Sequence, residues 1–204
     1  MNFKIITLVT SLVTSTLLAA QSPEASESSK TFVDSIGVNI GIANTSNSYD
    51  ASNAPDETFN SIELYTTLNP IMDICKEYNM KPTLSYTYSN NDDLKHQYLL
   101  VGINKYYTPT PKLNLYAGIV AGYGQIDWRY DPLGDSTNKN TDVNSFIGGI
   151  QLGTSYDMTE KFSLNLNSKY LIHNYTTNIK TNTETTKIKQ DNTATLSVGI
   201  GYRF

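Results

Sequence analysis

The chain has 204 residues, of which 17% are charged, and its formal net charge is −4. A mildly acidic chain with scattered lysines lacks the basic face that nucleic-acid binding needs, so we exclude that class of partner. Its single cysteine, Cys75, excludes an intrachain disulfide. We expect Cys75 to be a small residue in a turn rather than a catalytic nucleophile.

The first twenty residues have the layout of a secretory signal peptide. Lys4 supplies the positive charge, and Ile5–Leu18 is an apolar stretch diluted by Thr and Ser. This stretch is too short and too rich in hydroxyl groups to span a bilayer. We therefore predict a cleaved signal peptide at 1–20, a flexible periplasmic leader at 21–30 and one domain at 31–204.

Eight later segments alternate between apolar residues and polar or small ones, as strands with one apolar face do. Each is long enough to cross a bilayer at a tilt, which takes about 9–11 residues. The faces of the fourth segment cannot be assigned, because Leu, Val and Tyr occupy both. The predicted bounds are 31–43, 58–68, 80–89, 95–107, 112–128, 143–157, 161–174 and 191–204.

The connections between these segments alternate between two types. Short turns at one end and long polar loops at the other are typical of a membrane barrel, and they place both chain ends on the periplasmic side. The connection 69–79 fits least well because it contains apolar residues and proline. The predicted turns are 69–79, 108–111 and 158–160, and the predicted outer loops are 44–57, 90–94, 129–142 and 175–190.

The last strand shows the alternation most clearly. Val198-Gly-Ile-Gly-Tyr-Arg-Phe204 resembles the closing strand of the small OmpX/Ail and OmpA-type outer-membrane barrels. Such families end on a strand with an aromatic final residue that the barrel-assembly machinery recognises. The resemblance therefore implies that Tyr202 and Phe204 form an assembly signal. It also implies a structural or adhesive role for the loops, or a narrow pore.

Pattern and resemblance together predict an all-β fold, an eight-stranded antiparallel up-and-down transmembrane β-barrel in the cell outer membrane. Only helices and closed barrels pair every backbone polar group inside a bilayer. The strands alone leave open an inverted, soluble lipocalin-like barrel, which the terminal Phe204 and the loop lengths argue against. The expected surroundings are outer-membrane lipid and lipopolysaccharide, and we expect a monomer.

An eight-stranded barrel is just wide enough for side chains to fill its interior. Glu63 is predicted to point inward and needs a cation, since an unpaired buried charge is costly. Lys169 or Arg203 could supply it, so these three residues form the predicted polar network of the lumen. A structural network is favoured over a polar path for small solutes.

The predicted working surface consists of the long loops 44–57, 129–142 and 175–190, which suit an adhesion-like role with a host or surface ligand. The flanking Trp128, Tyr130 and Tyr175 are expected as girdle rings or ligand anchors. The alternatives are a narrow pore and, less favoured, a lipid-modifying enzyme. His96 and His173 lie on the loop side without a serine and an acid beside them, His173 as a rim or girdle residue. We therefore predict no catalytic residue, cofactor or metal site.

Overall fold

A computed structural model of the protein describes residues 32–49, 52–53, 57–91, 94–128, 142–180 and 185–204. The predicted signal peptide and leader lie outside these residues, as does nearly all of the predicted loop 129–142. In chain order the elements are β1 (Val33–Tyr49), β2 (Ser52–Asn53), β3 (Glu57–Leu68), α2 (Asp73–Glu77), β4 (Met80–Asn90), β5 (Leu94–Thr110), β6 (Leu113–Trp128), β7 (Asp142–Asp157), β8 (Phe162–Lys180) and β9 (Thr185–Arg203).

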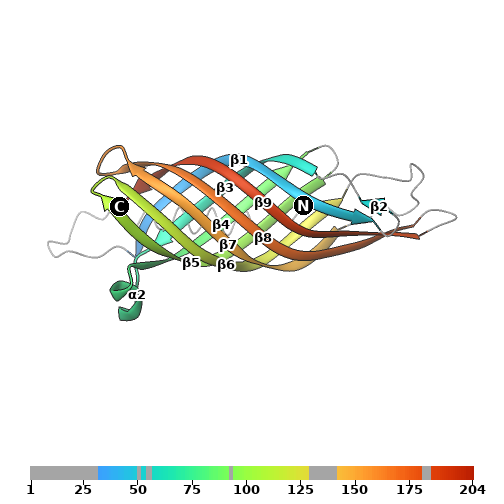
Figure 1. Cartoon of the computed structure of the whole chain (residues 1–204), viewed down its shortest axis with the longest axis horizontal. Helices are drawn as coiled ribbons and strands as arrows, with labels where there is room; N and C mark the ends of the chain where they lie inside the picture. The colour runs from blue at the N-terminus through green and yellow to red at the C-terminus, as the bar shows by residue number, and fades with distance from the viewer. Residues whose placement is uncertain (1–31, 50–51, 54–56, 92–93, 129–141, 181–184) are drawn as a thin grey trace.

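The long strands form one closed antiparallel barrel (Figure 1). Each pairs with the next long strand along the chain, and β1 also pairs with β9, which closes the sheet. The short β2 pairs with the outer end of β1. This arrangement confirms the predicted eight-stranded up-and-down barrel, with β2 as an addition. Within the described ranges, no helix is long and apolar enough to cross a membrane.

The apolar faces of the strands point outward. Neighbouring residues of β6 show this directly, since Ile119 is 64% exposed and Val120 is 6% exposed. An apolar outer wall is stable against lipid and costly against water, so the inverted lipocalin-like arrangement is ruled out. The outward apolar residues include Val38, Ile40, Ile62, Leu64, Val101, Ile119, Ile150, Leu164, Leu166, Val198 and Ile200.

Aromatic rings flank this apolar belt at both ends, as expected where a barrel meets the two membrane–water boundaries. On the loop side, the rings of Tyr123 and Phe146 lie 5.5 Å apart between centroids. On the periplasmic side, Tyr202 packs edge-to-face against Phe162 and Phe204 at 5.4 and 5.2 Å.

The faces of β5, which the sequence left open, are now assigned. Leu94, Tyr98 and Leu100 are buried inside the barrel, whereas Leu99 and Val101 are exposed on its outer wall. Apolar residues therefore occupy both faces of this strand near its outer end. The sequence could not assign the two faces because, at this end of β5, the inward residues are apolar as well as the outward ones.

Two of the predicted outer loops are largely strand instead. β1 continues to Tyr49, and β8 and β9 remain paired as far as Lys180 and Thr185, so the predicted loops 44–57 and 175–190 were wrong over most of their length. The pairings of β9 with β1 and with β8 both skip Asp191. Such a bulge interrupts the alternation, which explains why the strand seemed to begin after it.

The connection between β3 and β4 contains the short helix α2, which had not been predicted. Cys75 is the buried residue of this helix rather than a turn residue. The other periplasmic connections are short, and both described chain ends lie on the same side as α2 (Figure 1).

Candidate functional site in the barrel interior

The interior of the barrel is divided into two zones. The periplasmic half holds a polar cavity of about 400 Å³. Its lining begins at the periplasmic turns and ends about halfway along the barrel. The lining side chains include Asp34, Asn39, Glu63, Tyr65, Lys81, Ser85, Asn104, Tyr106, Tyr116, Gln151, Asp157, Asn165, Asn167 and Arg203.

Two ion pairs stand at the periplasmic end of this cavity. Arg203 donates two hydrogen bonds to the carboxylate of Asp157, at 3.0 and 3.1 Å. Lys81 donates to Asp34 at 2.8 Å. Arg203 therefore does not neutralise Glu63, which was one of the two arrangements considered from the sequence. Its partner was missed because Asp157, the last residue of the predicted strand 143–157, had not been assigned to the lumen.

Tyrosine rings occupy the middle of the cavity. The hydroxyl of Tyr65 accepts a hydrogen bond from Asn165 at 2.7 Å, and that of Tyr116 accepts one from Asn167 at 2.9 Å. Each ring lies over the glycine opposite it on a neighbouring strand, which is Gly37 of β1 for Tyr65 and Gly153 of β7 for Tyr116. A Cβ atom at either glycine would overlap the ring, so the wall needs glycine there.

Glu63 closes the cavity together with Lys169. The ammonium group of Lys169 is ion-paired with the Glu63 carboxylate and donates to Ser85 Oγ at 3.3 Å. Asn39 donates to the second Glu63 oxygen at 2.9 Å. Both charged side chains are almost fully buried. Because removal of charges from water is costly, such a pair depends on these additional hydrogen bonds.

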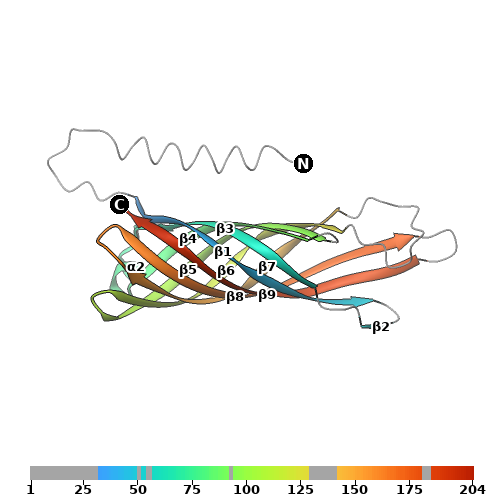
Figure 2. The same cartoon turned by 90° about the horizontal axis from the view of Figure 1, so that it is seen from above.

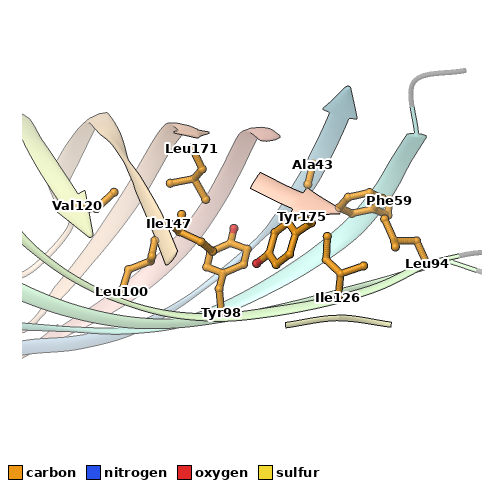
Figure 3. Close-up of a cluster of buried hydrophobic side chains, with 10 residues drawn as sticks. All are labelled: Ala43, Phe59, Leu94, Tyr98, Leu100, Val120, Ile126, Ile147, Leu171 and Tyr175. Carbon is orange, nitrogen blue, oxygen red and sulfur yellow. The ribbon is translucent and has the colours of Figure 1, made fainter. Parts of the chain in front are cut away.

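Beyond this ion pair, the loop-side half of the interior contains a buried cluster of apolar and aromatic side chains, which converge from opposite walls (Figure 3). We call this group the inner plug. Its members are almost inaccessible to solvent, with Leu171 at 0% and Tyr175 at 3% exposure. The prediction of Tyr175 as an outer ring was therefore wrong. The inner plug consists of Ala43, Phe59, Leu94, Tyr98, Leu100, Val120, Ile126, Ile147, Leu171 and Tyr175.

Both histidines are buried beside the inner plug. His173 lies inside the barrel rather than at the rim, with Nε2 at 2.8 Å from Thr193 Oγ1 and Nδ1 at 3.1 Å from the Gln190 carbonyl oxygen. Nε2 of His96 lies 3.2 Å from the Tyr175 hydroxyl. These are packing and hydroxyl contacts, and the buried Ser89 lies opposite His96 in the β4–β5 ladder. In the part of the chain that the structure describes, no three His, Cys, Asp or Glu side chains are grouped to hold a metal.

Sequence reasoning missed the inner plug, although a signal for it was present. Near the outer ends of several strands the alternation gives way to consecutive apolar residues, as in Leu99-Leu100-Val101 and Tyr170-Leu171-Ile172. In a strand, consecutive apolar residues mean that both faces are apolar. A polar lumen along the whole barrel was therefore an incorrect expectation.

Tyr202 and Phe204 lie at the seam where the barrel closes. Tyr202 pairs with Ile36 of β1 and Phe162 of β8, and the backbone amide of Phe204 donates to the Asp34 carbonyl at 3.1 Å. Their rings face outward in the periplasmic girdle. Tyr202 thus lies on the last strand, and Phe204 directly follows the end of that strand.

Comparison with known proteins agrees with this architecture. Residues 10–204 match the family described as "Outer membrane protein beta-barrel domain". A search of curated protein sequences finds no match. Among solved structures, Neisserial surface protein A has a TM-score of 0.58 at 16% identity, over 83% of this chain and 97% of that chain. AlkL has a TM-score of 0.53 at 12% identity, over 90% and 96%. Ail of Yersinia pestis has a TM-score of 0.46 at 13% identity, over 84% and 99%.

Proposed function

Because the chain belongs to the outer membrane protein beta-barrel domain family and lies in the outer membrane, we propose that it acts at the cell surface as a closed barrel. In this proposal the working surface is the outer extension of β8 and β9, with the adjoining end of β1. The role is structural or adhesion-like and does not involve solute passage through the lumen.

The inner plug is the observation that carries this proposal. A path for small polar solutes needs a polar, hydrated lining from one end to the other. The cavity ends at Glu63 and Lys169, and beyond it the inner plug crosses the lumen together with buried polar side chains such as His173 and Thr193. An apolar, filled segment offers no hydration to a passing ion or sugar, so the cavity is accessible from the periplasm alone.

The outer extension supports a surface role. The outward apolar residues of β8 end at Ile172, yet β8 and β9 stay paired to Lys180 and Thr185. These eight further residues amount to about 25 Å of strand. Figures 1 and 2 show both strands reaching past the rest of the barrel. A paired hairpin loses little conformational entropy when it binds, which favours recognition.

Several side chains that the structure describes as exposed on this extension are polar. Asn174, Asn178 and Lys187 are exposed, and Lys189 forms a 2.7 Å ion pair with Asp191. Amide and ammonium groups on a rigid ribbon suit a polar or acidic partner, such as a host glycan or an acidic protein surface.

Hairpin shortening tests the surface role. Replacement of residues 177–188 by a two-residue Asn-Gly turn should abolish binding of bacteria to host cells. The barrel should stay folded, as judged by different gel migration of unboiled and boiled samples. A matched control replaces Lys112 by Gln in the periplasmic turn between β5 and β6 and leaves the hairpin intact. Full binding by the shortened protein would contradict the proposal.

Planar-bilayer recording tests the opposing function, a narrow pore. We expect no steady conductance from the wild-type protein. Steady conductance that changes with Glu63→Gln or Lys169→Met would show that solutes pass the ion pair, and would favour the pore.

We also propose that Tyr202 and Phe204 form the signal for the barrel-assembly machinery, since both lie on the final strand and face the lipid boundary. Deletion of Phe204 should deplete the protein from outer-membrane fractions and leave it aggregated in the periplasm. Phe162→Leu, which alters the same ring cluster away from the terminus, serves as the control. Normal outer-membrane amounts of the deletion variant would overturn this assignment.

A further inference from the structure

The connection between β3 and β4 exposes more apolar surface than a periplasmic turn needs. Ile71, Met72, Ile74 and Tyr78 are 72%, 64%, 53% and 50% exposed. They occupy both flanks and the body of the five-residue helix α2, in which Cys75 is the buried residue. Four exposed apolar side chains within eight residues indicate a surface that meets something other than water.

The orientation of this segment is fixed by the barrel. Asn79 ends the helix with a left-handed backbone (φ 53°). Its carbonyl accepts a hydrogen bond from the Tyr106 amide at 2.9 Å, and its side-chain amide donates to the Tyr106 carbonyl at 3.1 Å. The backbone amides of Cys75 and Lys76 both donate to the Met72 carbonyl. The residue that follows the helix is therefore tied to β5, and the helix itself contacts the start of β4.

The helix projects sideways from the barrel, away from the barrel axis (Figure 1). Figure 1 shows α2 displaced laterally from the barrel wall, at the axial level of the periplasmic turns. A segment that left the barrel along its axis would enter the periplasm. A segment that leaves at right angles to the axis at this level lies along the inner surface of the membrane.

The apolar surface of this segment is continuous with the lipid-facing wall. The outward residues of β3 include Ile62, Leu64 and Leu68, and β4 begins with the outward residue Met80. The strands that meet lipid thus lead into the exposed apolar residues of the connection, with Asn69 on one side and Asn79 on the other.

We propose that residues 70–78, which we call the foot, dock on the phospholipid leaflet that faces the periplasm. Ile71, Met72, Ile74 and Tyr78 would enter the boundary between headgroups and acyl chains, as interfacial helices do. Lys76 is paired with Asp73 at 2.9 Å, and Glu77 leaves the foot with one net negative charge, which suits a zwitterionic surface better than an anionic one. The foot would fix the depth and rotation of the barrel in the membrane.

The ion pair between Lys76 and Asp73 also changes the pKa of the Asp73 carboxyl. The hydrogen bond from Lys76 lowers the pKa of the Asp73 carboxyl below its usual value. Asp73 therefore stays ionised in the periplasmic pH range, and Asp73 and Glu77 together outweigh Lys76, so the foot carries a net charge of −1. Anionic lipid should consequently not strengthen binding.

Single-tryptophan variants test the foot. The chain contains one tryptophan, so Trp128→Phe provides a silent background. Into it we would place Ile74→Trp in the foot, Glu160→Trp in the β7–β8 turn at the same end, and Ile119→Trp on the lipid-facing wall. Each protein is refolded into phosphatidylcholine vesicles that carry bromine on the acyl carbons nearest the headgroup, and unboiled gel migration confirms folding.

We expect the shallow bromines to quench at least about half of the Ile74→Trp emission, as for a side chain at the headgroup boundary. Glu160→Trp should remain unquenched and accessible to acrylamide. Equal, unquenched emission from both variants would overturn the proposal and leave the foot in water, available to a periplasmic protein. If Ile74→Trp does not fold, Met72→Trp gives the same measurement from the preceding turn, with the same expected and contrary results.

Discussion

The periplasmic and loop-side halves of the barrel interior are filled by different kinds of side chain. Both lie behind an apolar outer wall and both must fill a narrow lumen. The periplasmic half does so with tyrosines, asparagines and ion pairs around a cavity, whereas the loop-side half combines the inner plug with buried histidine and threonine side chains. The comparison shows that the lipid-facing pattern of a strand does not determine what its opposite face contains.

The two halves meet at the Glu63–Lys169 pair, so the largest expected effect lies there. Lys169→Met leaves a buried carboxylate without a cation, and we expect unfolding in urea with lipid vesicles to show a loss of about 3–5 kcal/mol. The double variant Glu63→Gln with Lys169→Met should recover most of this loss. A single-variant cost below about 1 kcal/mol would mean that cavity water already solvates the pair.

Truncation in the inner plug should be the next largest effect. Leu171→Ala removes a fully buried side chain from a packed region, and we expect a loss of about 2–5 kcal/mol. Ile172→Ala, its exposed neighbour on β8, should cost less in the same urea titration, since lipid can fill the space. Equal costs for the two variants would show that the loop-side half is loosely packed.

Two lysine substitutions compare the stability cost of a charge on the outer wall with its cost in the cavity. Val198→Lys places an ammonium group against lipid, and we expect it to cost about 2–4 kcal/mol. Ser155→Lys places the same group at the cavity lining near Asp157, where water and a carboxylate are available. The unfolding midpoints in vesicles should therefore rank Ser155→Lys above Val198→Lys, and the reverse ranking would contradict the assigned faces.

The smallest effect is expected inside the polar half. Asn165→Ala removes the 2.7 Å hydrogen bond to the Tyr65 hydroxyl, and we expect a cost of about 0.5–1.5 kcal/mol in urea unfolding. Water in the cavity can replace the lost donor. A cost as large as that of Leu171→Ala would show that the polar half is as tightly organised as the inner plug.

Much of the outer wall was predictable from sequence, because lipid imposes a simple requirement on every second residue. Val198 and Ile119 were assigned correctly from their alternation with small or polar neighbours. Turn positions also followed from composition, although α2 did not, since five residues are too few for a clear helical period.

The interior was less predictable, because its partners come from distant parts of the chain. Glu63 clearly needed a cation, but Lys169 and Arg203 were equally plausible until the register between strands was known. Arg203 turned out to lie beside Asp157. The strand extension past Asp191 was hidden by a one-residue irregularity, which changes the face of every residue after it.

The pairing of β1 with β9 has a consequence for how the chain reaches its final form. Neighbouring strands such as β8 and β9 can meet through a short connection, whereas the β1–β9 ladder joins segments from opposite ends of the domain. Bringing such distant segments together costs more chain entropy, and this slows the step. Until β9 arrives, β1 has an unpaired edge along its whole length, and that intermediate is the one most exposed to misassembly.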